Sequence, residues 1–430
     1  MKDKRLTLQE RLVRRRLHPP IYILYRMLVL IVKVLFLKKL GISFQYQVNL
    51  RDYPSPYIVV SNHASRLDYI YASLAFLPYS LNYVAGYNEF FRSHLAGIFR
   101  WMQVIPKKNF ISDPYTIREM KRILAKGGRV VLFPEGMSSI SGFNQPCMIA
   151  TGKLLKHCGL PVLMMKIAGA YLTSPKYSIL ERPGRVDVLV DSLFSPEDLA
   201  DMSAGEIQRK LDKAIAQDDY QWNKEKRVVY AGKGEMARNL HTLLYWCPKC
   251  NREFTMRGEG DRIVCSNCGN GAVLNEYYDL IPLDGTCVIP ATPRIWFDME
   301  RQNVRTWIRS GDFELRERVK LGVLPKYRYL KNQATSEIAG AGEILLNREG
   351  FHFTGEREGA AFSFSIRPEN LPTYGMCTDV SRFYTFYNRE FLEFFPEGET
   401  TAKWLLAAEE NHRLAGGRWQ DFPQEDEGRP

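Results

Sequence analysis

The stretch YIVVSNHASRLDYI, residues 57–70, decides how the surrounding chain folds. It opens as an apolar run typical of a buried strand and continues into a segment with helical character. His63 stands at the junction, and Asp68 follows five residues later. Two residues five apart would lie about 140° apart around one helix. We therefore expect His63 in the turn before the helix, from which it can fold back to Asp68 in the first turn.

The sequence around this stretch alternates between strand and helix patterns from about residue 46 to residue 235. Short apolar runs predict buried strands, and helical stretches such as 114–126 and 148–157 lie between them. Residues 195–216 are predicted to form one closing amphipathic helix that begins at Ser195 or Pro196. This alternation indicates an α/β domain, in which ligands bind where the strands end.

The residues at the junction suggest acid–base chemistry. A neutral imidazole oriented by a carboxylate is a general base, and a helix N-terminus favours the neutral form. Because no G-x-S-x-G motif supplies a nucleophile, we expect His63 to activate a substrate hydroxyl directly. The alternative is that His63 only caps a helix and Asp68 is a surface acid.

Four blocks of sequence together resemble a known family. They are NHASRLD at 62–68, QVIPKKN at 103–109, VVLFPEGMSS at 130–139 and GLPVLMMKIAGA at 159–170. In order and spacing they are similar to the lysophosphatidic acid acyltransferase family of glycerolipid acyltransferases, over about residues 50–220. The resemblance implies an α/β fold with a mixed sheet over residues 46–235.

The resemblance also implies an activity. It implies transfer of a fatty acyl group from a thioester, acyl-CoA or acyl carrier protein, to a hydroxyl of a lysolipid such as 1-acylglycerol-3-phosphate. His63 would be the general base and Asp68 would orient it, with no covalent acyl-enzyme and no catalytic metal. The substrate-binding residues that it implies are Asn62, Ser65, Lys107, Lys108, Glu135, Gly136, Ser138 and Ser139. The alternative for the two lysines is a solvated surface pair.

Two departures leave the acceptor headgroup open. The family's usual loop reads F-P-E-G-T-R-S, whereas Met137 and Ser138 stand here at the threonine and arginine positions. Met164 stands where a second proline is usual. The missing arginine removes a bidentate phosphate ligand, which a serine does not replace. The acceptor is then a lysolipid with a different headgroup or another hydroxylated lipid. Alternatively, backbone and hydroxyl groups of the loop still bind the phosphate of the usual acceptor.

Residues 1–45 are predicted to be a basic membrane anchor. Residues 1–40 carry eleven cations and two acids, so that 11 − 2 = +9 of the chain's net charge of +11 lies there. Residues 21–37 are apolar apart from tyrosines and the cations Arg26 and Lys33. Seventeen residues are short for a span, which needs about 20. The two cations form one narrow stripe, as in a helix that lies in the interface of an anionic membrane. A true span and a buried core helix remain open. We expect a peripheral or monotopic protein on the cytoplasmic face of the cell membrane.

Four of the eight cysteines form a metal-binding pattern. Cys247, Cys250, Cys265 and Cys268 read C-x2-C, fourteen residues, C-x2-C, and the intervening residues can form a hairpin. This spacing predicts a zinc ribbon over residues 242–280 with one structural Zn²⁺. Two disulfides and an iron or redox site are the alternatives. Because the nearby basic residues are nearly balanced by acids, we expect no nucleic-acid partner.

Residues 281–430 are predicted to form a small β-rich domain. A helix is expected from Pro293 to Ile308, and period-two strands follow from about residue 342, with hairpin turns at 347–350 and 388–390. A final helix over 400–414 closes a pattern that weakly resembles a pleckstrin-homology-like barrel. Two rival hypotheses for the whole chain are an inactive lipid-binding adapter and a nucleic-acid-associated zinc protein.

Overall fold

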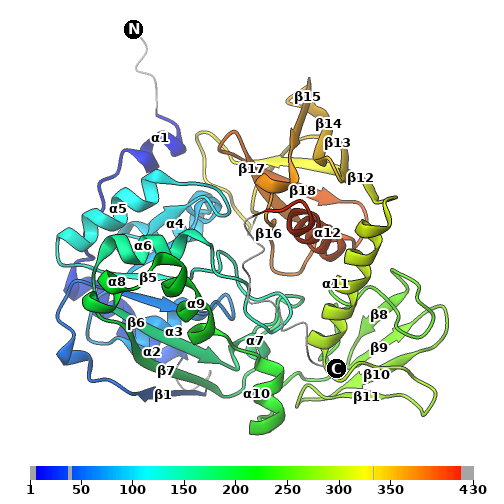
Figure 1. Ribbon diagram of the computed structural model, residues 1–430, viewed down its shortest axis with the longest axis horizontal. Coiled ribbons are helices and arrows are strands. Elements are labelled where there is room, and N and C mark those ends of the chain that lie inside the picture. Colours follow the sequence, from blue (N-terminus) through cyan, green and yellow to red (C-terminus); the bar gives the residue numbers. More distant parts are fainter. Residues whose placement is uncertain (1–5, 37–40, 333, 418–430) are drawn as a thin grey trace.

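The computed structural model describes residues 6–36, 41–332 and 334–417. Figure 1 shows a large α/β unit on one side and two smaller β-rich units on the other. We name them the N-terminal unit (residues 42–226), the cysteine unit (242–282) and the C-terminal unit (293–414). Five of the cations counted in the basic N-terminal region lie outside the described residues: Lys2, Lys4, Arg5, Lys38 and Lys39.

A seven-stranded sheet forms the centre of the N-terminal unit, in the order β1-β7-β6-β2-β5-β3-β4. The pair β1 and β7 runs antiparallel to the other five strands, because β7 pairs antiparallel with β6. The sheet is therefore mixed, as the sequence predicts. The strands are β1 Ile42–Tyr46, β2 Tyr57–Ser61, β3 Asn82–Gly86, β4 Ile105–Lys107, β5 Arg129–Leu132, β6 Val162–Ala168 and β7 Val186–Phe194.

Side chains of β2 alternate between two hydrophobic layers. Tyr57 and Val59 belong to the layer shared with α2 (Tyr22–Phe36) and α3 (Asp68–Ala75). Ile58 and Val60 point into the other layer, where helices α5 (Pro114–Ala125), α6 (Ala150–Cys158) and α9 (Ala204–Ile215) cover the sheet. β2 is thus a central strand buried on both faces, which is what its uninterrupted apolar run predicts.

The prediction of one helix over residues 195–216 is wrong. The structure has α8 (Pro196–Asp201) and a separate α9. Ser203 begins the second helix with a capping box, in which its side chain accepts from the Glu206 N–H and the Glu206 carboxylate accepts from the Ser203 N–H. These two bonds satisfy N–H groups that a continuous helix would have paired internally, so the chain restarts there.

The N-terminal region holds two helices where the sequence predicts one. The additional helix is α1 (Leu8–Val13), which begins with a capping box between Thr7 and Glu10. Helix α2 packs on the N-terminal unit through Tyr25 and Val29, both buried. Among the described residues, no helix is both long and apolar enough to cross a membrane.

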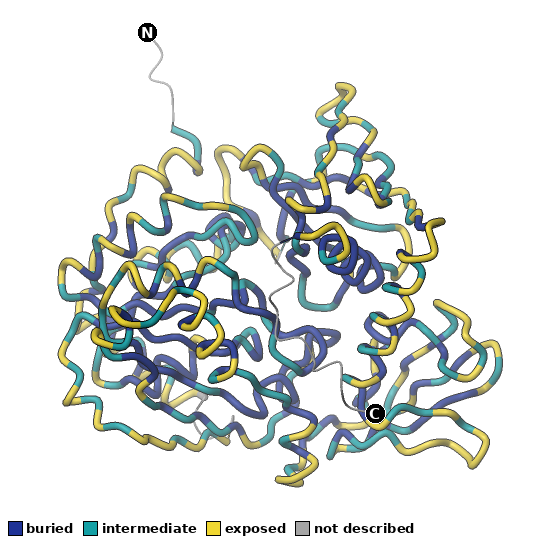
Figure 2. The backbone as a smooth tube through the Cα atoms, in the orientation of Figure 1, coloured by how far each residue is buried: buried dark blue, intermediate teal, exposed yellow. Residues whose placement is uncertain are grey.

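The cysteine unit is a small antiparallel sheet in the order β11-β10-β9-β8. Its strands are β8 Met256–Glu259, β9 Arg262–Cys265, β10 Gly271–Leu274 and β11 Leu280–Pro282. β8 and β9 form a hairpin between the two cysteine pairs, as the spacing predicts. The unit is thinly covered, and much of its backbone is exposed in Figure 2.

The C-terminal unit is one antiparallel sheet in the order β15-β14-β13-β12-β18-β17-β16, with two helices. The predicted hairpin turns are confirmed, between β13 and β14 and between β17 and β18. Helix α12 is buried along most of its length (Figure 2), and Trp404 packs on Phe351 and Phe383. The elements are α11 Pro293–Ser310, β12 Glu314–Val323, β13 Glu337–Asn347, β14 Gly350–Arg357, β15 Ala360–Ile366, β16 Gly375–Met376, β17 Phe383–Tyr387, β18 Glu390–Pro396 and α12 Thr401–Leu414.

Polar contacts hold the three units together. Buried Arg182 donates to the hydroxyls of Tyr177 and Tyr278, both at 2.8 Å, and Tyr278 lies just after β10. The C-terminal unit reaches the other side of the N-terminal unit, where the Leu330 N–H donates to the Phe91 carbonyl at 2.8 Å. The hairpin β17–β18 lies next to the segment that follows β4, because Lys108 donates to the Arg389 carbonyl in the hairpin turn.

Candidate active site

His63 lies in the turn between β2 and α3, and Asp68 is the first residue of α3. The His63 Nδ1 atom is 2.8 Å from Asp68 Oδ2. The Asp68 side chain is 1% exposed and that of His63 is 25% exposed. An ionised carboxylate only accepts, so in such a pair the proton lies on Nδ1, and Nε2 is the ring nitrogen that Asp68 does not engage. The geometry is that of an imidazole oriented by a buried carboxylate, with one edge of the ring open.

Ser65 holds the aspartate in place. Its hydroxyl donates to Asp68 Oδ1 at 2.9 Å, and its N–H lies 3.0 Å from both carboxylate oxygens. The Leu67 N–H in turn donates to the Ser65 hydroxyl at 3.1 Å. The structure thus places Ser65, expected among the substrate-binding residues, behind the aspartate, where its hydroxyl already has a partner.

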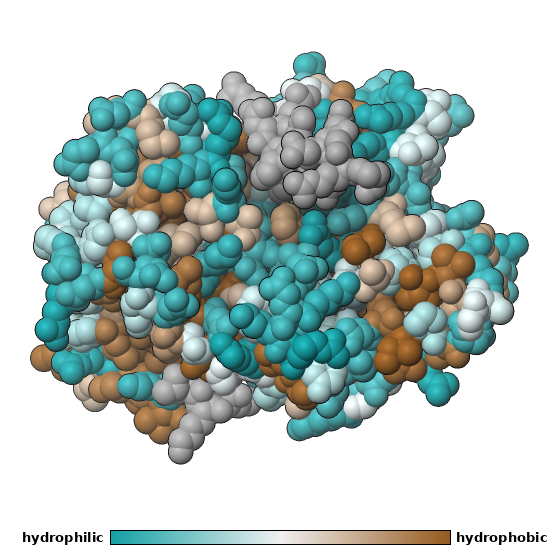
Figure 3. Space-filling view, turned by 60° about the horizontal axis from the view of Figure 1, so that its bottom comes forward, coloured by the Kyte–Doolittle hydropathy of each residue, from teal (hydrophilic) through white to brown (hydrophobic). Residues whose placement is uncertain are grey.

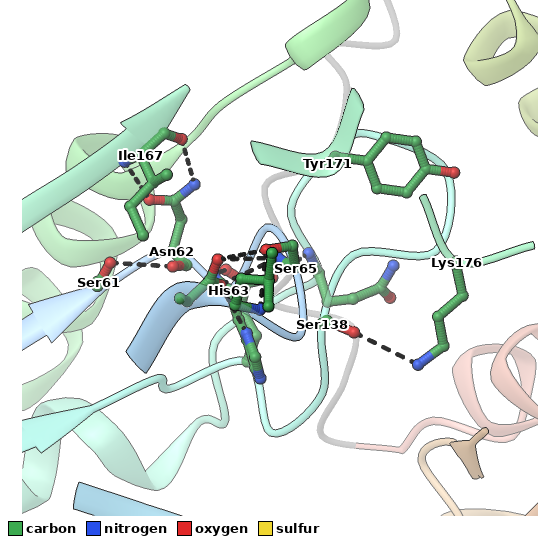
Figure 4. A network of polar contacts seen from close by, with 12 residues as sticks. Ser61, Asn62, His63, Ser65, Ser138, Ile167, Tyr171 and Lys176 are labelled. Carbon is green, nitrogen blue, oxygen red and sulfur yellow. Dashed lines mark hydrogen bonds and ion pairs between the residues drawn. The ribbon is translucent and has the colours of Figure 1, made fainter. Parts of the chain in front are cut away.

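Asn62 is likewise occupied by the fold. Its Nδ2 donates to the Ile167 carbonyl, and its Oδ1 accepts from the Ile167 N–H, both at 2.8 Å. This pair of bonds ties the turn to β6 (Figure 4). The amide is buried and has no free edge for a substrate. Asn62 therefore sets the position of the turn and does not reach an acceptor.

Glu135 and Ser139 clamp the main chain of His63 from two sides. The Glu135 carboxylate accepts from the His63 N–H and the Gln145 N–H, both at 2.6 Å. The Ser139 N–H donates to the His63 carbonyl at 2.7 Å. Glu135 is fully buried, and this burial raises the pKa of its carboxyl to about 8, against the two N–H bonds that lower it. Both residues were expected to bind substrate, and in the structure they hold the turn that carries His63.

Gly136 has a conformational reason to be glycine. Its φ is +81°, and a Cβ there would lie 3.0 Å from the Phe110 ring. Its carbonyl accepts from Asn109 Nδ2 at 2.8 Å. The same Asn109 atom is 3.4 Å from the hydroxyl of Tyr384 on β17. The loop of residues 133–139 is therefore joined, through one asparagine, to the C-terminal unit.

Lys107 and Lys108 are not a solvated surface pair. The Lys107 ammonium donates to the carbonyls of Lys108 and Ile111, at 2.9 and 3.2 Å, and burial lowers the pKa of Lys107. Lys108 donates to the carbonyl of Arg389 in the β17–β18 turn at 2.7 Å. Both cations thus hold main-chain oxygens, and Lys108 fastens the C-terminal unit to the N-terminal unit.

Sequence reasoning missed Lys176. Its Nζ is 3.4 Å from the hydroxyl of Ser138, the loop residue that stands where the resemblance led us to expect an arginine (Figure 4). Lys176 follows the short helix α7 (Ala170–Thr173), in a stretch that carries no periodic or motif signal. Only the tertiary structure brings this cation to the loop.

The four clustered cysteines form a candidate metal centre. Their sulfur atoms all lie within 4.8 Å of one another, and every described cysteine is free of disulfides. Cys247 and Cys268 are 3.7 Å apart, and Cys250 and Cys265 are 3.8 Å apart. A tetrahedral ion with metal–sulfur bonds of about 2.3 Å requires sulfur atoms about 3.8 Å apart. The arrangement can hold one such ion.

Both cysteine pairs turn in the same way. The Asn251 N–H donates to the Cys247 carbonyl at 2.9 Å, and the Gly269 N–H donates to the Cys265 carbonyl at 3.0 Å. Asn251 and Gly269 each follow the second cysteine of a pair and have a positive φ, 58° and 72°. Two like turns from opposite ends of the hairpin therefore present the four sulfur atoms to one point.

Residues 42–167 match a family model described as Acyltransferase. The chain carries an acyltransferase domain. The matched residues of this domain include His63, Asp68, the loop 133–139 and the strands from β1 to most of β6. No curated protein matches the chain.

One solved structure similar to the chain is the crystal structure of the 1-acyl-sn-glycerophosphate (LPA) acyltransferase PlsC from Thermotoga maritima. It is 18% identical, with a TM-score of 0.39, over 47% of this chain and 79% of that one.

Glu135→Gln tests the clamp in the acyltransferase domain. One glutamine nitrogen must face a backbone N–H, so we expect a loss of about 1–3 kcal/mol in the free energy of unfolding. The folded pKa of Glu135 is raised above its unfolded value, so its contribution to stability is full near pH 4.5 and is lost as the pH rises through 8. The stability difference between wild type and variant should therefore shrink from pH 5 to pH 8 in denaturant titrations.

The matched control is Glu197→Gln, which changes an exposed glutamate on α8 and should leave stability unaltered at both pH values. A difference between wild type and Glu135→Gln that grows with pH would show instead that Glu135 is ionised in the folded protein.

Proposed function

We propose that this protein is an O-acyltransferase that moves a fatty acyl group from a thioester to a hydroxyl of a lysolipid. The observation that carries the proposal is the bond of 2.8 Å between His63 Nδ1 and buried Asp68, with the ring's other edge open. A base that is held by a carboxylate and faces outward can take a proton from a bound alcohol. The acyltransferase domain supports the reaction class.

The chemistry follows from this pair. His63 Nε2 takes the proton of the acceptor hydroxyl as its oxygen attacks the thioester carbonyl. Asp68 stabilises the imidazolium that forms. When the tetrahedral intermediate collapses, the C–S bond breaks and the imidazolium returns its proton to the departing thiolate. The products are an ester and a free thiol, and the histidine is neutral again. No group on the enzyme is acylated.

The fold supports the base by fixing its main chain. Glu135 and Ser139 hold the N–H and the carbonyl of His63, and Asn62 ties the same turn to β6. The imidazole therefore has little freedom except rotation of its own side chain, which Asp68 restricts. Such preorganisation keeps the base within reach of the hydroxyl without a conformational search. We propose acyl-CoA or acyl carrier protein as donor and a lysolipid such as 1-acylglycerol-3-phosphate as acceptor.

His63→Ala tests the base. We expect thioester turnover to fall by at least 10²–10⁴-fold because the hydroxyl loses its proton acceptor. Asp68→Asn should also reduce turnover strongly, since an amide can hold the wrong tautomer. The measurement is release of free thiol from oleoyl-CoA with 1-oleoylglycerol-3-phosphate, with the esterified product identified by mass spectrometry.

The matched control is His157→Ala. This exposed histidine on α6 lies near the start of strands β2 and β6, whereas His63 follows the end of β2, so the variant should retain full turnover. Wild-type protein that binds lysolipid but consumes no thioester with any acceptor would favour the rival hypothesis, an inactive lipid-binding adapter.

We further propose that the four cysteines hold one structural Zn²⁺. Four thiolates complete the coordination of zinc, so the ion has no open position for catalysis. Asn270 supports the centre, because its Nδ2 is 3.7 Å from Cys247 Sγ and also donates to the Val288 carbonyl at 3.0 Å. The ion would fix the hairpin β8–β9, whose Met256 and Ile263 belong to the core shared with the other units.

Cys265→Ser should abolish stoichiometric zinc and destabilise the cysteine unit, since the thiolate set loses one member. Elemental analysis should find one zinc per chain in wild-type protein and less than a tenth of that in the variant. Cys287→Ser is the control, because this thiol is near the unit but outside the cluster, and its zinc content should match wild type. Wild-type protein without zinc, or with iron in its place, would contradict the proposal.

We propose that α2 rests on a lipid surface. Its outer side exposes a continuous apolar band: Ile23 at 68%, Met27 at 58%, Ile31 at 54% and Val34 at 80%. Figure 3 shows apolar side chains gathered on the part of the molecule that carries the large sheet. Exposed apolar surface of this extent is rare in proteins that meet only water. With the basic residues beside it, this band suits an anionic membrane, and we propose the cytoplasmic face of the cell membrane.

Val34→Glu combined with Ile23→Glu should weaken sedimentation with vesicles of phosphatidylglycerol and phosphatidylcholine at least tenfold. Charges buried in the acyl region are costly, and both positions lie on the exposed band. Added salt should weaken binding of the wild type as it screens the N-terminal cations. Ile338→Glu, at a site on β13 that is 55% exposed, is the control and should bind normally. Binding that neither the double variant nor salt alters would contradict this role of α2.

A further inference from the structure

Lys176 is a buried cation without a matching anion. The residue is 7% exposed, and the Ser138 hydroxyl at 3.4 Å is the one hydrogen-bond partner of its ammonium among the residues that the structure describes. In the same described ranges, no carboxylate oxygen lies within 4.0 Å of its Nζ. An ammonium has three donors, and removing it from water is costly unless they are satisfied. The Lys176 ammonium therefore has donor capacity that an anion could satisfy.

The charges around Lys176 add to this. Burial, with a smaller contribution from the positive charge of Arg66, lowers the pKa of Lys176 to about 8. Asp379, Cys377 and Glu89 act in the opposite direction, but the pKa of the Cys377 thiol is itself raised well above normal by burial, so that it is neutral. The Arg66 guanidinium donates to the carbonyls of Ser178 and Ile179, at 3.2 and 2.8 Å. The positive charge of Arg66 is thus near enough to lower the pKa of Lys176, and a bound anion would offset that repulsion.

Lys176 is linked to the proposed base through the loop 133–139. Its ammonium touches Ser138, and the next residue, Ser139, donates to the main-chain carbonyl of His63. Figure 4 shows the lysine side chain reaching back to the loop beside the imidazole. The lysine is fixed from behind, because its carbonyl accepts from the Asp379 N–H of the C-terminal unit at 2.8 Å. The cation is thus held beside the loop 133–139, which supports the base.

We propose that Lys176 binds the anionic headgroup of the acceptor lipid. The proposal rests on the proposed acyl transfer and names the chemistry of the acceptor: a hydroxyl group carried a few bonds from a phosphate or similar anion. The Ser138 hydroxyl and Lys176 supply a donor pair from two elements, in a loop that has no arginine. A free phosphate has the same chemistry as a lipid headgroup, so the two sources must be distinguished.

Direct binding to full-length protein with the His63→Ala change tests the site without turnover. The probes are 1-oleoylglycerol-3-phosphate, 1-oleoylglycerol with the same chain but no phosphate, and inorganic phosphate. Lys176→Met, which keeps the shape of the side chain, should weaken binding of the phosphorylated lipid at least tenfold. It should change binding of the neutral lipid less than twofold. Lys176→Arg should restore most of the loss. Inorganic phosphate should compete with the phosphorylated lipid only when Lys176 is present.

Turnover is then measured on the same Lys176 variants in protein that retains His63. These measurements distinguish this proposal from the proposed function. Lys176→Met should raise KM for the phosphorylated acceptor at least tenfold with a smaller change in kcat. Lys166→Met, a partly buried lysine on β6 in a different hollow, is the matched control and should leave both constants unchanged. Thermal melting checks that each variant is folded.

Equal weakening of both lipids by Lys176→Met, or no weakening of either, would overturn the headgroup site. Competition by inorganic phosphate that leaves lipid binding independent of Lys176 would also overturn it. Lysine-dependent binding in a wild type that consumes no thioester would support the site and reject the proposed reaction.

Discussion

The clamp on the His63 main chain is the constraint on which the candidate active site depends. A turn between a strand and a helix has few internal hydrogen bonds, so its conformation must be set from outside. Here the N–H of His63 is bound by the Glu135 carboxylate and its carbonyl by the Ser139 N–H, from a loop 72 residues further along the chain. With the backbone held on both sides, the orientation of the imidazole ring is set by its hydrogen bond to Asp68.

This clamp explains why motif residues expected to touch substrate are turned into the protein. Asn62, Ser65, Glu135 and Ser139 each use their side-chain polar atoms on other groups of the protein. A buried polar group must be paired, and once it is paired it has little left for a ligand. Under the proposed reaction, few groups remain for an acceptor: the open edge of His63, the hydroxyl of Ser138 and the ammonium of Lys176. Specificity for the proposed headgroup would then rest on very few atoms.

The C-terminal unit is part of the site's surroundings. Arg389 accepts from Lys108, Tyr384 meets Asn109, and Asp379 holds the backbone of Lys176. All three contacts come from β17, its flanking turns or the segment just before it. They reach Lys108, Asn109 and Lys176, of which Asn109 and Lys176 contact the loop 133–139 directly. The cysteine unit connects the two larger units through a continuous core. A metal bound there would therefore stabilise the position of the C-terminal unit relative to the N-terminal unit.

Much of this protein is determined by local sequence. Strands, most helices, the hairpin turns and the cysteine knuckles follow from periodicity and spacing, because each depends on contacts between residues close in the chain. The approach of His63 to Asp68 follows in the same way, over five residues. Tertiary structure alone decided that Glu135 and Asn62 serve the fold, that Lys108 fastens a second unit, and that Lys176 reaches Ser138. Each of these outcomes depends on which distant group arrives to pair with a buried polar atom, and a linear pattern carries no record of that partner.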